Sequence, residues 1–195
     1  MSNKKNKKIF NITIVGLMTA IATVIYMGPE IPIVPGVDYM KVDFSDFPAI
    51  LTGVIFGPIQ GILVEVFKNI IHLTRTTTFG IGEIMNIVIG SSMILSMSLS
   101  VKAFKKLFKS NKINLKIYFI SSAITIIIAI VMGWIANIVF TPIFYNIMGI
   151  PLVAQTYWAG VWGSTTLNSI KAAFNILPFF PIYFALEKGV KKYTM

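Results

Sequence analysis

The sequence has 195 residues, of which 55% are hydrophobic and 12% charged, and its mean hydropathy is +0.78. Soluble domains carry about twice that charged fraction, so the composition excludes a soluble globular domain. The absence of cysteine excludes disulfides and thiolate metal sites, and the single histidine excludes a multi-histidine metal centre. The net charge of +10 comes from lysines that cluster at the ends of apolar segments, which is typical of cytoplasmic loops and not of a nucleic-acid-binding surface.

The first apolar segment, about 9–28, follows a group of lysines within residues 4–8. A basic start, an apolar run and the small residues Ala20 and Ala22 resemble a signal peptide, but no exported soluble domain follows them. We therefore expect an uncleaved first transmembrane helix. Gly16 and Ala20 lie one turn apart on this helix and would let another helix approach closely.

The next apolar stretch, 47–74, could cross the membrane once or twice. A single crossing would put the lysine-rich segment 102–116 outside, although lysine-rich loops usually stay in the cytoplasm. Gly57-Pro58 can break the stretch, because proline cannot continue the helical hydrogen bonds and glycine permits a turn. We therefore predict an all-α integral membrane protein that forms one domain over residues 1–195, with both termini in the cytoplasm. Its six transmembrane helices are expected at about 9–28, 47–57, 58–74, 80–103, 113–145 and 160–187.

With this topology, three segments lie outside the membrane: 28–48, 73–83 and 141–160. They are rich in proline, glycine or aromatic residues and could cover a pocket that opens outward. Ordinary interfacial loops with an aromatic belt are the alternative.

A row of polar residues interrupts the last predicted span. Asn168, Lys171 and Asn175 have the spacing of one helix face, and ionisable residues inside spans usually face the interior of a bundle. Together with Asn86 and Asn137 on other helices, they favour a ligand pocket near the outer surface. Hydrogen bonds between helices explain the asparagines equally simply, and a lysine can also extend its ammonium to the membrane surface.

Candidates for acid–base chemistry are few. Glu65 and Lys68 could pair on one helix face, which a structural ion pair explains. Asp43 and Asp46 stand where the second helix is expected to begin. Helix capping by Ser45 or Asp46 explains this acidic pair better than catalysis does. The chain also lacks the glycine-rich phosphate loop of ATPases, so no catalytic residues are predicted.

Several pieces of the sequence form a combined pattern. The most specific piece is VDFSDFPAILTGVIFGPIQGILVEVFKNIIH at 42–72, which is joined by GIGEIMNIVIG at 80–90, an asparagine late in the fifth helix and N-x-x-K in the sixth. Over nearly its whole length the chain resembles the substrate-binding S components of energy-coupling-factor (ECF) vitamin transporters, most closely their riboflavin-specific members. The resemblance implies the ECF S-component fold, a multi-pass place in the bacterial cell membrane, and an outward-facing vitamin pocket.

The same resemblance implies the partners and the ligand. The partners are the transmembrane coupling protein EcfT and two cytoplasmic ATPases, and Gly16 and Ala20 match the surface that meets the coupling protein, where the family prefers alanines. Riboflavin is implied as a transported ligand and not as a cofactor, and the chain itself is no enzyme. Asparagine can donate and accept hydrogen bonds at once, which suits a flavin edge and ribityl hydroxyls. The implied contacts are Asn137, Asn168 and Lys171, with Tyr39, Met40 and Val42 covering the ring.

Alternatives remain at this point. The same fold could bind FMN, a pyrimidine precursor or another vitamin, and Arg75, the one arginine, lies outside where it could meet a phosphate. A small membrane enzyme would have to use Glu65 and Lys68. An autonomous proton-coupled transporter would be expected to carry inverted repeats, and none is evident.

Overall fold

The computed structural model describes residues 2–28, 31–32 and 41–190, and this part of the chain is almost entirely helical. The two short strands form an antiparallel pair in which Ile31 lies opposite Val42. In chain order the elements are α1 Ser2–Met27, β1 Ile31–Pro32, β2 Lys41–Val42, α2 Asp46–Phe56, α3 Pro58–His72, the 3-10 turn η1 Leu73–Arg75, α4 Ile81–Leu107, α5 Leu115–Ile147, α6 Ala154–Ile176 and α7 Phe179–Val190.

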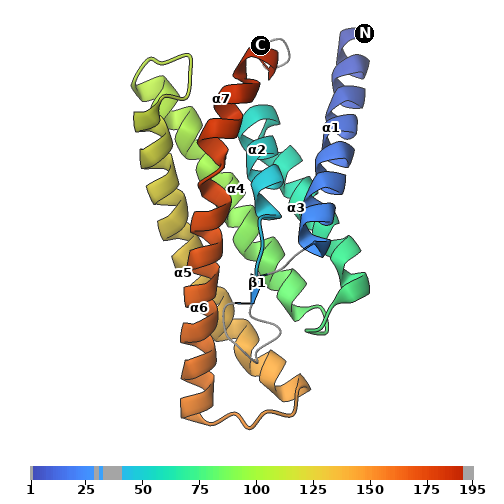
Figure 1. The fold of residues 1–195 in the computed structure, drawn as a ribbon, viewed down its shortest axis with the longest axis vertical. Helices are drawn as coiled ribbons and strands as arrows, with labels where there is room; N and C mark the ends of the chain where they lie inside the picture. Colours follow the sequence, from blue (N-terminus) through green and yellow to red (C-terminus); the bar gives the residue numbers. More distant parts are fainter. Residues whose placement is uncertain (1, 29–30, 33–40, 191–195) are drawn as a thin grey trace.

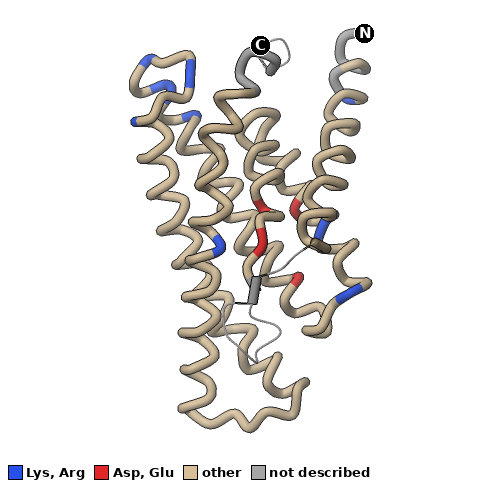
Figure 2. The backbone as a smooth tube through the Cα atoms, in the orientation of Figure 1, with Lys and Arg blue, Asp and Glu red and all other residues tan. Residues whose placement is uncertain are grey.

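The helices run up and down a single bundle (Figure 1). The two ends of the chain and the α4–α5 connection lie at one end, and the α5–α6 connection lies at the other. The largest group of basic residues lies at the first end, whereas the acidic residues lie near the middle of the molecule (Figure 2). In the described chain, three helical stretches are long and apolar enough to cross a membrane. They are Lys8–Met27, Ile81–Leu107 and Leu115–Ile147.

The predicted break between the second and third helices is present. α2 ends at Phe56, and Gly57 has a φ of 118°, a conformation that favours glycine. Pro58 then opens α3 at a position where its missing N–H costs nothing. The two helices pack so closely that a Cβ atom on Gly61 would lie 2.8 Å from the Cα of Gly53.

The last expected helix, 160–187, is wrong as a single element. α6 ends at Ile176 and α7 begins at Phe179, because Pro178 cannot donate the next helical hydrogen bond. The break leaves backbone carbonyl groups without a helical partner. The Tyr118 hydroxyl donates to one of them, the carbonyl of Ile176, at 3.1 Å. The two helices still follow one another along one side of the bundle (Figure 1).

The third expected outer segment, 141–160, is mostly helical and not a loop. α5 continues through Pro142 to Ile147, and α6 starts as early as Ala154. Only a short connection remains between them, so little chain from this segment can form a lid.

Candidate substrate-binding site

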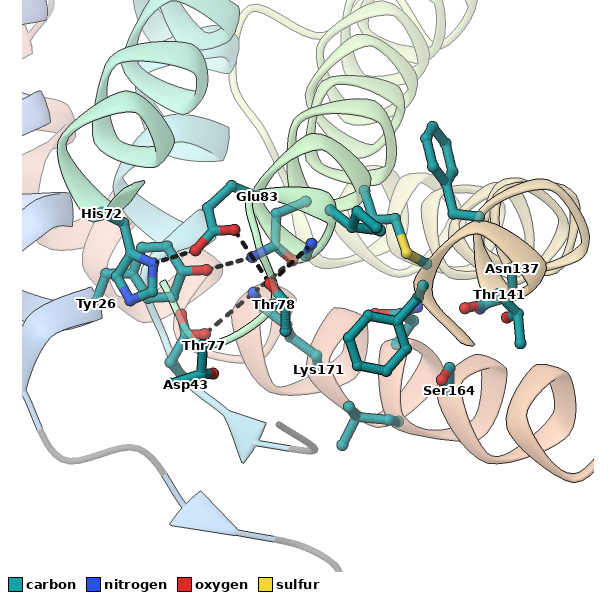
Figure 3. Close-up of a pocket in the computed structure, with 18 of the residues that line it drawn as sticks. Tyr26, Asp43, His72, Thr77, Thr78, Glu83, Asn137, Thr141, Ser164 and Lys171 are labelled. Carbon is teal, nitrogen blue, oxygen red and sulfur yellow. Dashed lines mark hydrogen bonds and ion pairs between the residues drawn. The ribbon is translucent and has the colours of Figure 1, made fainter. Parts of the chain in front are cut away.

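A cavity of about 320 Å³ lies within the bundle. Its size falls in the range of roughly 300–1,000 Å³ that is usual for small-molecule sites. It is lined by the end of α1, the α3–α4 connection, α4, α5 and α6, together with Asp43 before α2 (Figure 3). Aromatic and aliphatic side chains such as Phe140, Phe144 and Met85 supply apolar walls, and polar groups converge from several helices.

The structure brings together four of the residues singled out in the sequence. Asn86, Asn137, Asn168 and Lys171 line this one cavity from α4, α5 and α6. Asn137 is oriented by hydrogen bonds from its amide nitrogen to the carbonyl of Gly133 (2.8 Å) and to the hydroxyl of Thr165 (3.3 Å) on α6.

The other predicted positions do not join this group. Tyr39 and Met40 lie outside the described residues. Val42 is buried in β2 and is not among the residues that line the cavity. Gly16 and Ala20 are exposed on the surface of α1, as a surface that meets another protein would require.

Lys171 does not reach for the membrane surface. It is 6% exposed, and its ammonium lies 3.1 Å from Asp43 Oδ2, 3.6 Å from Asp46 Oδ2 and 3.2 Å from Asn86 Oδ1. The ring of Tyr26 is 5.5 Å away, within range of a cation–π interaction. The positive charge of Lys171 is therefore balanced by buried carboxylates, and the side chain still lines the cavity.

Lys68 is the centre of a second set of contacts directly behind the cavity. Its ammonium lies 2.9 Å from Glu65 Oε2, which confirms the predicted ion pair, and it also pairs with Asp46. It donates to the hydroxyl of Ser45 at 3.0 Å. The predicted capping of α2 is wrong: Ser45 stands at the cap position but makes no capping hydrogen bond, and its hydroxyl instead accepts a hydrogen bond from the Lys68 ammonium. Asp46, the other capping candidate, is the first residue of the helix.

Asp43 stands between β2 and α2, outside the helices, and is 4% exposed. Burial by itself raises the pKa of this carboxyl group. The nearby charges of Lys171 and Lys68 and hydrogen bonds from Ser45 outweigh burial and lower the pKa to about 2. The backbone N–H of Ser45 donates one of these bonds at 2.7 Å. Asp43 is therefore an anion at neutral pH.

Asn175, one turn deeper than Lys171, makes hydrogen bonds within the protein and does not face the cavity. Its amide nitrogen donates to the Asp43 carbonyl at 2.9 Å, and its oxygen accepts from the Phe47 N–H at 2.8 Å. It is fully buried and does not line the cavity. Asn175 thus ties the start of α2 to α6.

The sequence did not predict that Tyr26, His72 and Glu83 form an aromatic and acidic group in the cavity wall, next to Asn86 and Lys171 (Figure 3). The rings of Tyr26 and His72 stack with centroids 3.7 Å apart, and His72 Nδ1 lies 2.8 Å from Glu83 Oε1. Asn86 donates to the Tyr26 hydroxyl at 2.6 Å. Thr78 also donates to Glu83, at 3.3 Å. A buried glutamate in the first turn of an apolar helix was the one signal that could have pointed here.

The arrangement suits reversible binding of a small molecule that has both polar groups and an apolar part. Amide groups can donate and accept, while apolar walls can cover a ring. No cluster of metal-ligating side chains occurs among the described residues. Fold and cavity together define a multi-pass helical protein of the cell membrane with an internal small-molecule site.

Comparison with known proteins defines the family. Residues 10–183 match the family described as "ECF transporter, substrate-specific component", so the chain belongs to that family, as its motifs predicted. Members of this family are the substrate-binding subunits of transporters and not enzymes.

Individual relatives agree with this assignment. The chain is 27% identical over 194 residues to the riboflavin transporter FmnP of Bacillus subtilis (strain 168), which covers 95% of this chain and 96% of that protein. It is 31% identical over 97 residues to the riboflavin transporter RibU of Staphylococcus aureus (strain TCH60), about half of each chain (49%). A solved structure of the S component of a bacterial ECF transporter superimposes with a TM-score of 0.72 at 24% identity, covering 98% of this chain and 99% of that one, which supports the fold.

Proposed function

We propose that this protein is the riboflavin-binding subunit of an ECF-type ABC importer. It captures the vitamin from outside the cell and delivers it inward together with a transmembrane coupling protein and two ATPases, which supply the energy of ATP hydrolysis. The exposed small residues Gly16 and Ala20 on α1 are the proposed docking position for the coupling protein.

One observation carries the choice of ligand. Asn86, Asn137, Asn168 and Lys171 converge from three helices on a cavity that also has apolar walls, formed by side chains such as Phe140, Phe144 and Met85. Riboflavin combines a flat apolar ring with a polar edge and a chain of hydroxyl groups, so it needs this mixture of surfaces. That two relatives carry the name of riboflavin transporters supports the same choice.

Binding can be measured directly on the purified protein in detergent. Titration should give saturable quenching of riboflavin fluorescence, with a dissociation constant at or below the micromolar range. Absence of quenching at micromolar protein would overturn the proposal.

A pair of variants on α6 makes the test specific. Asn168→Ala removes an amide that lines the cavity, and we expect riboflavin affinity to fall about tenfold or more, because ligand groups lose their partner on burial. Thr166→Ala is the matched control: Thr166 is exposed and donates to the Trp162 carbonyl of its own helix at 2.9 Å. Equal affinities of the two variants would place the ligand elsewhere.

FMN is the second candidate ligand, favoured by one feature. Arg75 lines the cavity in η1, is exposed, and donates to the Met27 carbonyl at 3.1 Å. A phosphate at this rim would gain a charge-assisted hydrogen bond. Parallel titrations with riboflavin and FMN distinguish the two: tighter binding of FMN that is lost in Arg75→Gln would favour the phosphorylated ligand.

A further inference from the structure

Five charged side chains form a connected cluster that reaches from the cavity wall into the protein. Asp43 and Lys171 line the cavity, whereas Asp46, Glu65 and Lys68 do not. The five are buried, with exposed fractions between 0% and 6%. Removing this many charges from water is costly, and stability alone would be served as well by apolar packing. The cost of burial therefore favours a specific task for the cluster.

Lys68 is connected to the cavity by two short routes. Through the first, its ammonium donates to Ser45 Oγ, and the Ser45 N–H donates to Asp43 Oδ1. Through the second, Lys68 pairs with Asp46, whose other oxygen lies 3.6 Å from the ammonium of Lys171. Both routes end on the Asp43–Lys171 pair in the wall of the cavity.

The charges of the cluster explain how Lys68 can affect the position of Lys171. With its groups ionised, the cluster holds three carboxylates and two lysines, so the carboxylates compete for cations. Lys68 pairs with Asp46 and Glu65. Lys171 therefore lies closer to Asp43 (3.1 Å) and Asn86 (3.2 Å) than to Asp46 (3.6 Å). Without Lys68, Asp46 would draw the Lys171 ammonium away from Asn86 and from the cavity.

We propose that Lys68, which lies outside the cavity, is a positioning residue for ligand binding: by holding Asp46 and Ser45 it keeps Asp43 and Lys171 in their places in the cavity wall. The inference rests on the proposed function, since it assigns Lys68 a part in riboflavin binding. It also makes a claim about the ligand-free protein, namely that Lys68 holds the segment 42–47 in place.

A charge-matched double variant tests this proposal. Lys68→Met with Glu65→Gln removes one positive and one negative group and leaves the net charge of the cluster unchanged. Glu65→Gln preserves side-chain length, and Lys68→Met shortens the side chain by one atom. A glutamine oxygen at 65 can still accept from Asn69, which donates to Glu65 Oε1 at 2.8 Å. The control is Ser96→Ala with Thr125→Val, which removes a buried hydroxyl pair 3.2 Å apart that does not line the cavity.

Two measurements are made on each protein. The first is riboflavin affinity, expected to fall about tenfold or more in the double variant and to stay unchanged in the control. The second is hydrogen exchange of segment 42–47 without ligand, expected to be faster only in the double variant, because the Ser45 N–H loses its fixed acceptor. A melting temperature similar to that of the control shows that the difference is not general unfolding.

A cycle with Lys171→Met and Asp43→Asn, replaced together so that no buried carboxylate loses its nearest cation, separates positioning from simple stability. If Lys68 acts through Lys171, the double variant should lower affinity much less once Lys171 is already replaced. Additive losses of affinity would contradict that route.

Each remaining outcome is decisive. Unchanged riboflavin affinity and unchanged exchange in the double variant would overturn the proposal. If the wild-type protein binds no flavin, the proposed function fails, and exchange at 42–47 still decides whether Lys68 holds that segment. Should the double variant not fold, Ser45→Ala removes the hydroxyl that accepts from Lys68 and also bonds to Asp43, and a loss of affinity of about threefold with faster exchange is expected. No change in Ser45→Ala would count against the proposal.

Discussion

Lys171 illustrates how a lysine is retained inside an apolar bundle. Two carboxylates, an amide oxygen and an aromatic ring surround its ammonium. Truncation of Lys171 would leave Asp43 buried without its nearest cation, which is strongly destabilising in proteins. A Lys171→Ala variant would therefore report on folding as much as on ligand binding, and Asn168 is the cleaner probe of the cavity.

At the residue scale, the charge of Asp43 predicts an acid-dependent loss of stability. Its pKa is lowered to about 2 from an ordinary value of 3.8, so its stabilising effect is complete above the ordinary value and disappears as the pH falls toward about 2. Asp43→Asn removes the charge but keeps an oxygen that can accept from the Ser45 N–H. We expect the wild-type melting temperature to fall more steeply than that of the variant between about pH 4 and pH 2. Parallel curves would contradict this assignment.

The spacing in the sequence sufficed to group Asn168 with Lys171, because residues three apart share a helix face. It could not reveal that Asp43 is the partner of Lys171. The two residues lie on segments far apart in the chain, and the packing of β2 and α2 against α6 joins them. The role of Ser45 was mistaken for the same reason, since its true partner, Lys68, lies on another helix.

At the scale of elements, the close contact of α2 and α3 places Asp46 next to Lys68. Gly53 and Gly61 form this contact, and a Cβ atom on Gly61 would meet the Ala49 carbonyl oxygen at 2.6 Å. Backbone atoms cannot move aside as a flexible side chain can. The glycines therefore set the distance between the two helices, and through it the geometry of the charged cluster.

Gly61→Ala should accordingly destabilise the protein by about 2 kcal/mol, within the range for overpacked cores. Gly16→Ala is the matched control, because no atom lies within 4 Å of a Cβ atom there and alanine favours helix. Melting temperatures in detergent compare the two variants. If Gly61→Ala melts with the wild type, the contact between α2 and α3 is looser than the structure has it.

At the scale of the whole molecule, the bundle places both chain ends and the lysine-rich α4–α5 connection together (Figures 1 and 2). Lysine-rich connections favour the cytoplasm, so the α5–α6 connection is expected outside. α2 has only 11 residues and is largely buried, which allows it to be shorter than a full span.

This topology can be tested with single cysteines, because the chain has none of its own. Asn111→Cys lies in the α4–α5 connection, and Gln155→Cys lies at the start of α6; both positions are exposed. A membrane-impermeant thiol reagent should label Gln155→Cys on intact cells and Asn111→Cys only after lysis. The reverse pattern would invert the proposed orientation.

The sequence alone determined the class of protein, the break at Gly57-Pro58 and the family, because hydropathy, proline and glycine act through local chemistry. It also selected four of the residues that line the cavity. Only the tertiary structure decided that Lys171 is paired with Asp43, that Asn175 holds the start of α2, and that Tyr26, His72 and Glu83 complete the cavity. These contacts depend on which helices lie side by side. A buried charge finds its partner only when segments distant in the chain pack together.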